Sequence, residues 1–123
     1  MPNIAYFDIP ADNVDRARKF YSALLGWKIS PSPVEGAAAS QYHEVVTGEP
    51  EPGTMHRGGL YMRQGGEPIH SFVKVDDIDA ILLKVEELGG KVVMPKWPIR
   101  GVGLVAMIQD SEGNGIGIWK PAV

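Results

Sequence analysis

The sequence predicts an α+β fold in which one β-α-β-β-β module occurs twice, in residues 1–63 and again in 68–121. Three observations predict it: two amphipathic helical segments, strand-like segments on either side of each, and one offset that aligns the two halves. The chain has 123 residues, which suits a single compact domain over 1–123. We expect an eight-stranded mixed sheet that curls into a cup, with both helices outside.

The two helices carry clear start and stop signals. The first is expected after Asp12-Asn13, whose side chains can accept hydrogen bonds from the amides of a first turn, and it ends at Gly26. The second is expected from Asp77 to Gly89-Gly90. Apolar residues recur at helical spacing in both, which indicates a face packed on a sheet. They are Val14, Ala17, Phe20, Tyr21, Leu24 and Leu25, then Ile78, Ile81, Leu82, Val85 and Leu88.

Short apolar or alternating segments around the helices predict the strands. They span residues 4–9, 27–30, 41–47, 58–63, 69–75, 91–94, 103–109 and 115–119. The sequence Asp-Ser-Glu-Gly-Asn at 110–114 predicts a hairpin turn. We interpret residues 31–39 as a loop that acts as a flap, and residues 64–67 as the linker between the halves.

An offset of 64 residues aligns the two halves. It places Asp12 on Asp76 and Gly26 on Gly90, and it superposes the apolar positions of the two helices. A shared cap, a shared apolar phase and a shared final glycine in one register indicate a duplicated module. Either half alone would leave one face of its sheet unburied, so we expect both to surround a hollow that binds a small molecule.

Composition excludes several classes of function. A net charge of −3 leaves no basic excess for general nucleic-acid binding, and the absence of cysteine excludes disulfides and thiolate chemistry. No apolar run approaches the roughly 20 residues of a membrane span. The first residues, Met-Pro-Asn-Ile-Ala, lack the regions of a secretory signal. We therefore expect a cytoplasmic protein with no nucleic-acid partner and no membrane partner.

Several motifs resemble a known family. The stretch from Phe7 to Tyr21 (FDIPADNVDRARKFY), followed by Leu25-Gly26-Trp27, is similar to the opening of the vicinal oxygen chelate superfamily. This superfamily groups glyoxalase I, bleomycin-resistance proteins and extradiol dioxygenases. Residues 75–80, 88–90 and 110–114 are similar to its second half. The resemblance implies paired β-α-β-β-β modules, a cupped sheet and commonly a homodimer, but it says little about activity, because the superfamily hosts many reactions.

The resemblance also implies where a metal would bind. The family's metal enzymes carry histidine or glutamate ligands on the first and last strand of each module. Carried over, the first-strand positions fall on Tyr6, with a slip to Phe7 left open, and on His70. The last-strand positions fall near Gly59 and Gly117, which offer no side-chain donor. A divalent ion needs about three protein donors, so we expect no cofactor; a divalent metal held in part by His70 is the alternative.

A cup without a metal would hold a small organic molecule by aromatic and apolar contacts. The predicted ligand-binding residues are Tyr6, Tyr61, Trp97, Trp119, Gly59 and Gly117, with Tyr42 and Met107 as further wall candidates. Each aromatic residue has the ordinary alternative of a place in the core. His70 is the candidate catalytic residue because imidazole titrates near neutral pH; its alternative is a solvated strand residue.

The sequence thus favours a small-molecule-binding protein of the glyoxalase/bleomycin-resistance type with no metal at the family site. A divalent-metal-dependent lyase, isomerase or dioxygenase of the same fold remains the alternative, and a module with a vestigial cup is a third. The sequence leaves open the ligand, whether the chain is an enzyme, and whether modules pair within one chain or between two.

Overall fold

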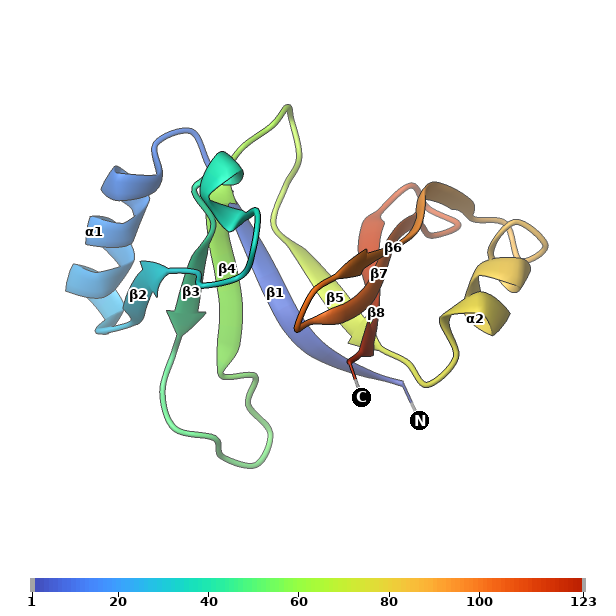
Figure 1. The fold of residues 1–123 in the computed structure, drawn as a ribbon, viewed down its shortest axis with the longest axis horizontal. Helices are drawn as coiled ribbons and strands as arrows, with labels where there is room; N and C mark the ends of the chain where they lie inside the picture. Colours follow the sequence, from blue (N-terminus) through green and yellow to red (C-terminus); the bar gives the residue numbers. More distant parts are fainter. Residues whose placement is uncertain (1, 123) are drawn as a thin grey trace. The chain divides into compact units, whose positions relative to one another are not determined.

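The computed structural model describes residues 2–122 and confirms the predicted α+β class. Each half of the chain contains the strand, helix and three further strands that the sequence predicts (Figure 1). In chain order the elements are β1 (Asn3–Ala11), α1 (Val14–Leu25), β2 (Lys28–Pro31), the 3₁₀ helix η1 (Ala37–Ser40), β3 (His43–Val46), β4 (Arg57–Met62), β5 (His70–Lys74), α2 (Ile78–Val85), β6 (Lys91–Ile99), β7 (Gly103–Gln109) and β8 (Gly115–Pro121). The strands form one eight-stranded mixed sheet in the order β2-β3-β4-β1-β5-β8-β7-β6.

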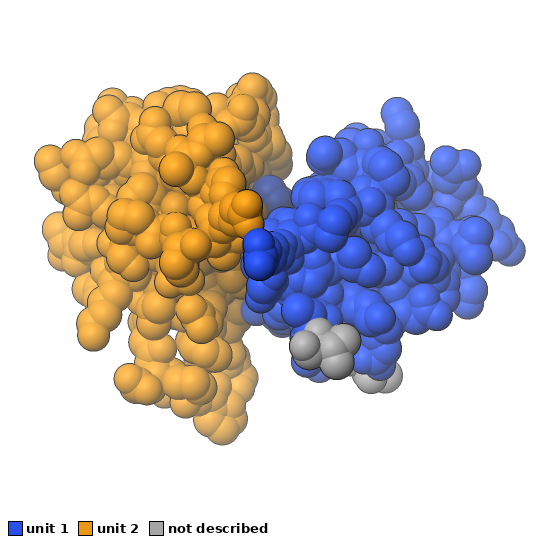
Figure 2. All heavy atoms as spheres, viewed as in Figure 1, with its two compact units in different colours: residues 1–5, 70–123 blue, residues 6–69 orange. Residues whose placement is uncertain are grey.

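The chain divides into two compact units (Figure 2). Unit 2 is Tyr6–Ile69, and unit 1 combines residues 1–5 with residues 70–123. β1 therefore contributes its first residues to unit 1 and the remainder, from Tyr6 on, to unit 2. The cup between the modules and the module limits of 63 and 68 stay predictions.

The two units repeat one strand register. In unit 2, β1 pairs in parallel with β4 so that Asp8 lies beside Gly59. In unit 1, β5 pairs in parallel with β8 so that Phe72 lies beside Gly117. Asp8 and Phe72 are related by the 64-residue offset found in the sequence. The duplication therefore extends from the helix caps to the pairing of individual strand residues.

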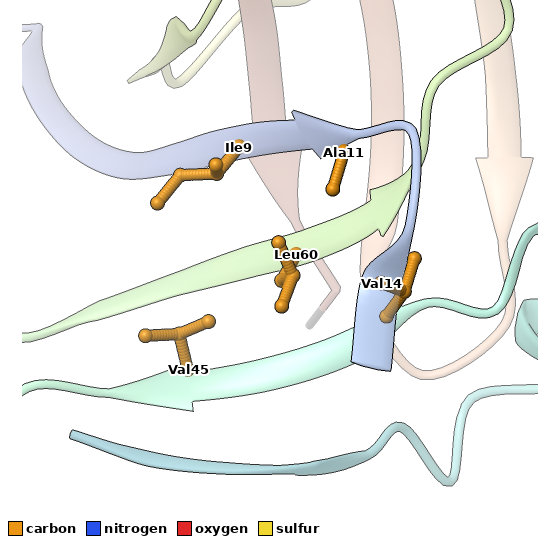
Figure 3. Packing of buried hydrophobic residues seen from close by; sticks show 5 residues of the cluster. All are labelled: Ile9, Ala11, Val14, Val45 and Leu60. Atoms are coloured by element: carbon orange, nitrogen blue, oxygen red, sulfur yellow. The ribbon is translucent and has the colours of Figure 1, made fainter. Parts of the chain in front are cut away.

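The core of unit 2 lies between its strands and α1. Ile9, Ala11, Val45 and Leu60 come from three neighbouring strands and pack with Val14, the first residue of α1 (Figure 3). Because successive strand side chains point to opposite faces, the residues between these core residues face away from the helix. Asp8 and Gly59 are therefore directed to the face of the sheet opposite α1.

Unit 1 has a core of the same kind. Val75, Ile78, Ala106 and Ile118 are buried together, with Ile78 contributed by α2. Ile118 lies between Gly117 and Trp119 in β8, so these two neighbours face away from α2. Each unit thus presents one sheet face to its helix and leaves the predicted site glycine on the other.

The helix signals of the sequence are confirmed at three of the four ends. The side chain of Asn13 accepts a hydrogen bond from the Arg16 amide at 2.9 Å, and Gly26 ends α1 with φ of 72°. Asp77 caps α2 in the same way through the Ala80 amide at 3.1 Å. The predicted end of α2 at Gly89-Gly90 is wrong, because the helix stops at Val85 and a turn follows.

Other local expectations also need correction. Leu88 lies beyond the end of α2 and is 75% exposed, and Leu24 of α1 is 64% exposed, so the apolar helix faces are wider than the faces that pack. β6 continues past Met94 to Ile99, with register shifts on either side of Met94. The helix η1 was not expected, because its sequence Ala-Ala-Ala-Ser carries no cap signal. Among residues 2–122, no helix is long and apolar enough to cross a membrane.

Leu60 tests the core of unit 2. Its side chain is fully buried, so Leu60→Ala removes packed methyl groups and leaves a cavity. We expect the free energy of unfolding to fall by about 2–5 kcal/mol in urea titrations. Leu83→Ala is the matched control, because Leu83 is 81% exposed, and its effect should stay within about 0.5 kcal/mol. Equal losses in the two variants would contradict this core.

Candidate functional site

A buried carboxylate marks the candidate site in unit 2. Asp8 is 8% exposed and is the one charged residue in the buried class among residues 2–122. On the sheet face away from α1 it begins a cross-strand row, because Asp8 of β1 and Glu44 of β3 both lie beside Gly59 of β4. Burying a charge is costly unless it is hydrogen-bonded. The partners of Asp8 therefore define the site.

Tyr42 supplies the hydrogen bond and fills the space above Gly59. Its hydroxyl donates to Oδ1 of Asp8. Its phenol occupies the place where any side chain at position 59 would begin. Only glycine allows this approach, because a Cβ at position 59 would overlap both the Tyr42 hydroxyl and the Asp8 carboxylate. Gly59 and Asp8 together create the seat for the phenol.

Two further tyrosines complete the site. The hydroxyls of Tyr6 and Tyr42 are 2.9 Å apart. A phenol has one proton, and that of Tyr42 is directed to Asp8, so Tyr6 donates to Tyr42 when Asp8 is ionised. The ring of Tyr61 stacks on that of Tyr42, with centroids 6.1 Å apart and planes 20° apart. The result is a directed chain of hydrogen bonds, Tyr6 to Tyr42 to Asp8, beside an aromatic wall.

The linker after β4 anchors this wall. The Tyr61 hydroxyl donates to Oε2 of Glu67 at 3.2 Å, and the same carboxylate accepts from the amides of Gln64 at 2.9 Å and Gly65 at 2.7 Å. These amide bonds lower the pKa of Glu67. Arg63 adds a bond from its guanidinium to the Glu67 carbonyl at 2.6 Å. The expected linker thus has a structural role in orienting Tyr61.

Burial keeps the three phenols protonated. It raises the pKa of Tyr6 to about 12. Burial, followed by the charge of Asp8, raises the pKa of Tyr42 well above its usual value. Burial and the charge of Glu67 raise the pKa of Tyr61. At neutral pH these groups can therefore act as hydrogen-bond donors and acceptors, and they are poor candidates for a general base.

The remaining predicted residues lie in unit 1. The His70 ring is 5.4 Å from the ring of Phe72, which fills the space above Gly117 as Tyr42 does above Gly59. Trp97 of β6 and Trp119 of β8 lie on either side of Val105 of β7 in one cross-strand row. The Trp119 indole donates to the Val102 carbonyl at 2.9 Å, and Met107 lies beside Gly117.

The structure therefore groups the predicted residues by unit. Tyr6, Tyr42, Tyr61 and Gly59 meet in unit 2, whereas His70, Trp97, Trp119 and Gly117 belong to unit 1. The expectation that the two glycines let a ligand approach the backbone stays a prediction. In this structure, side chains of the chain itself fill both spaces.

Sequence reasoning missed Asp8. It considered Tyr6 and a slip to Phe7, but not the acid that follows them. Asp8 interrupts an otherwise apolar strand and alternates with Ile9, a pattern that places a carboxylate on one sheet face. That signal was available. The proximity of Tyr42 was not, because it depends on the path of the chain before β3.

The residues do not fit the divalent ion that the family implies. Within residues 2–122 there is no group of three or more His, Asp or Glu side chains placed to hold a metal. In unit 2 the carried-over ligand positions hold a protonated phenol, Tyr6, and Gly59. The nearby Asp8 already accepts the Tyr42 hydroxyl. A family-type ion needs about three donors, and this set does not supply them.

Comparison with known proteins identifies the family. The profile of the Glyoxalase/Bleomycin resistance protein/Dioxygenase superfamily matches residues 3–118. The chain belongs to this superfamily. Putative glyoxylase CFP32 of Mycobacterium bovis is 31% identical over 118 residues, covering 94% of this chain and 44% of that protein. Anthracycline biosynthesis protein DnrV of Streptomyces peucetius is 28% identical over 135 residues, covering 97% and 47%. The chain thus spans about half the length of these curated relatives.

Solved structures share the superfamily fold. Methylmalonyl-CoA epimerase from Mycobacterium tuberculosis aligns with a TM-score of 0.67 at 18% identity, covering 98% of this chain and 88% of that chain. A methylmalonyl-CoA epimerase in complex with methylmalonyl-CoA aligns with a TM-score of 0.71 at 17% identity, covering 100% and 96%. A superfamily member from Vibrio splendidus aligns with a TM-score of 0.67 at 11% identity, covering 99% and 100%. At these identities the likeness shows the fold alone.

Gly59 tests the seat of the phenol. In Gly59→Ala the new methyl group displaces Tyr42 from Asp8, so we expect a loss of about 1–3 kcal/mol in the free energy of unfolding. Gly66→Ala is the matched control, because nothing lies within 4 Å of a Cβ built there and its φ is not left-handed. It should be neutral or slightly stabilising. A Gly59→Ala protein as stable as wild type would refute this packing.

The phenols also predict an alkaline dependence of stability. Their pKa values are higher in the folded chain than the value of 10.0 expected on unfolding, so their contribution is complete below about pH 10 and is lost as pH rises toward the folded value of Tyr6, about 12. Urea unfolding across this range should show a falling free energy. The fall should be shallower in Tyr42→Phe, which lacks one of the titrating phenols. Identical slopes for the two proteins would contradict the raised pKa of Tyr42.

Proposed function

We propose that the chain is a small-molecule-binding protein of the glyoxalase/bleomycin-resistance type that holds an organic ligand without a divalent metal. One observation carries the proposal. A hydrogen-bonded group of Tyr6, Tyr42 and Asp8, walled by Tyr61, stands in unit 2 where the family resemblance places metal ligands. Phenols and one buried carboxylate recognise polar groups on an aromatic molecule better than they hold a hard cation.

The donor chemistry supports a site that works by hydrogen bonding. The pKa of Tyr6 is raised to about 12, so its hydroxyl stays neutral at physiological pH. A neutral phenol is a weak ligand for a divalent ion but a good partner for a hydroxyl or carbonyl of a ligand. The same residues therefore disfavour the metal-dependent lyase, isomerase or dioxygenase as the function of this chain.

The relatives support an organic ligand. One solved superfamily neighbour is a methylmalonyl-CoA epimerase in complex with methylmalonyl-CoA, and one curated relative is an anthracycline biosynthesis protein. These names describe those proteins. For this chain, the stacked rings of Tyr42 and Tyr61 favour an aromatic ligand over an acyl chain.

Three further expectations belong to the proposal. Trp97 and Trp119 of unit 1 are additional ligand-binding candidates, and His70 is the candidate acid–base residue if the chain is an enzyme. A homodimer and a cytoplasmic location stay predictions. None of them is needed for the binding test below, which addresses unit 2 directly.

Binding can be tested with a panel of small aromatic compounds in the presence of EDTA. We expect compounds that bind to shift the amide resonances of Tyr6, Asp8 and Tyr61 in two-dimensional NMR spectra. Tyr61→Ala should weaken the binding roughly threefold to tenfold, because a stacked aromatic pair contributes about 0.5–1.5 kcal/mol. Phe20→Ala is the matched control, since Phe20 is an exposed aromatic residue of α1. Binding that requires an added divalent ion would overturn the proposal.

A further inference from the structure

We propose that the space above Gly59 is a binding site for a phenol, which the chain's own Tyr42 occupies in this structure. A ligand with a hydroxyaryl group binds there by displacing the Tyr42 side chain. This inference rests on the proposed function and deepens it by naming the ligand class. The Tyr42 side chain then competes with the ligand for the space above Gly59. The site is closed until a ligand displaces this side chain.

Four residues of unit 2 line the Tyr42 phenol. Gly59 leaves room beneath it, and Asp8 accepts its hydroxyl proton. Tyr6 contacts the same hydroxyl oxygen at 2.9 Å, and Tyr61 stacks on the ring. These four partners all lie on β1 and β4, two paired strands of unit 2. The seat is therefore fixed by the sheet, independently of the residue that fills it.

Tyr42, which fills this site, lies in contrast in the loop between η1 and β3. Tyr42 precedes β3 and ends the segment that contains η1. Gln41, directly before it, has φ of 53° and is the one non-glycine residue among 2–122 with a positive φ. Such a conformation costs free energy and persists only where neighbouring contacts impose it. At Gln41 these contacts are backbone hydrogen bonds that end η1, including the bond of the Gln41 amide to the Ala38 carbonyl at 3.1 Å. The backbone before Tyr42 is therefore held independently of the phenol.

Tyr42 can leave without unfolding the segment. Its backbone is held separately, by its amide on the Ala37 carbonyl and by its carbonyl on the Ser32 amide, both at 3.0 Å. Rotation of the side chain alone therefore empties the seat. Two hollows elsewhere in the described residues, of about 170 Å³ near Lys74 and about 90 Å³ near Lys28, are smaller than the roughly 300 Å³ of a typical ligand site.

The seat selects its ligand by chemistry. A hydroxyl is needed to donate to Asp8 and to accept from Tyr6, and a flat ring is needed to stack on Tyr61. A plain hydrocarbon ring would not replace the hydroxyl that donates to the buried Asp8 carboxylate, and losing such a hydrogen bond in a buried place is costly. An anionic ligand would meet Asp8 and also Glu44, which flanks Gly59 from β3. A neutral phenol satisfies all of these groups, as the Tyr42 side chain does.

The test uses p-cresol, which has the structure of a tyrosine side chain, and toluene, which lacks the hydroxyl. Both are titrated by NMR into wild type, Tyr42→Phe, and Tyr42→Phe combined with Asp8→Asn. Loss of the Tyr42 hydroxyl weakens the internal competitor, so p-cresol should bind Tyr42→Phe on the order of tenfold more tightly than wild type. Toluene should not gain in this way, and Asp8→Asn should reduce the preference for p-cresol.

Tyr21→Phe is the matched control. Tyr21 is also stacked, on Trp27 at 5.2 Å, but it packs with the core on the α1 side of the sheet. Loss of its hydroxyl should leave the affinity for p-cresol unchanged. Wild type supplies a readout that does not depend on any variant folding: saturating p-cresol should shift the amides of Gln41, Tyr42 and His43, whereas toluene should not.

The outcomes separate this inference from the proposed function. Equal p-cresol affinities in wild type and Tyr42→Phe, or equal gains for toluene and p-cresol, overturn the inference. If other aromatic compounds still bind to unit 2 without a metal, the proposed function stands while the inference fails. If no compound of the panel binds in EDTA, the proposed function fails, and the p-cresol gain in Tyr42→Phe is expected to be absent with it.

Discussion

The register between β1 and β4 is the constraint on which the rest of the site depends. It places Asp8 beside Gly59, so that a buried carboxylate stands next to a position with no side chain. The phenol of Tyr42 fits only into that combination. A slip by one residue would turn Asp8 toward α1 and the core, where no partner for its charge exists among Ile9, Ala11 and Leu60. Core packing and site geometry are therefore set by the same pairing.

The duplication explains how the two units diverge on one scaffold. Both hold a glycine at the corresponding position of the last strand, and both cover it with an aromatic side chain. In unit 1 the ring is that of Phe72, which lies in β5, the strand paired with the one that carries Gly117. The space above Gly117 is therefore filled by a residue of the sheet itself. In unit 2 the paired strand supplies Asp8, and the ring is brought in by Tyr42 from a connection. The position above the glycine is thus filled by apolar packing in one unit and by a hydrogen-bonded phenol in the other.

The presence of Asp8 and Tyr42 in unit 2 changes the chemistry of this position in the fold. Where the family resemblance places metal ligands, unit 2 has a neutral phenol, that of Tyr6, and close by a carboxylate, Asp8, that accepts the Tyr42 hydroxyl. Hydrogen bonds to a buried carboxylate are strong and directional. In our proposal they are also exchangeable, because a ligand hydroxyl would replace the Tyr42 hydroxyl as the donor to Asp8. Under the proposed function, a site of this chemistry would distinguish ligands by their hydroxyl and ring.

The sequence by itself determined the α+β class, the duplicated module, the helix caps at Asn13 and Asp77, and the end of α1 at Gly26, because these depend on local hydrogen bonding and on the periodicity of apolar residues. It also indicated Tyr6, Tyr42, Tyr61 and Gly59 as candidate binding residues, but it did not show which of them contact one another. Only the tertiary structure decided that Asp8 and Tyr42, which are 34 residues apart, share a hydrogen bond above Gly59. Such a contact depends on strand order, register and the path of a connection, and none of these leaves a periodic trace in the sequence.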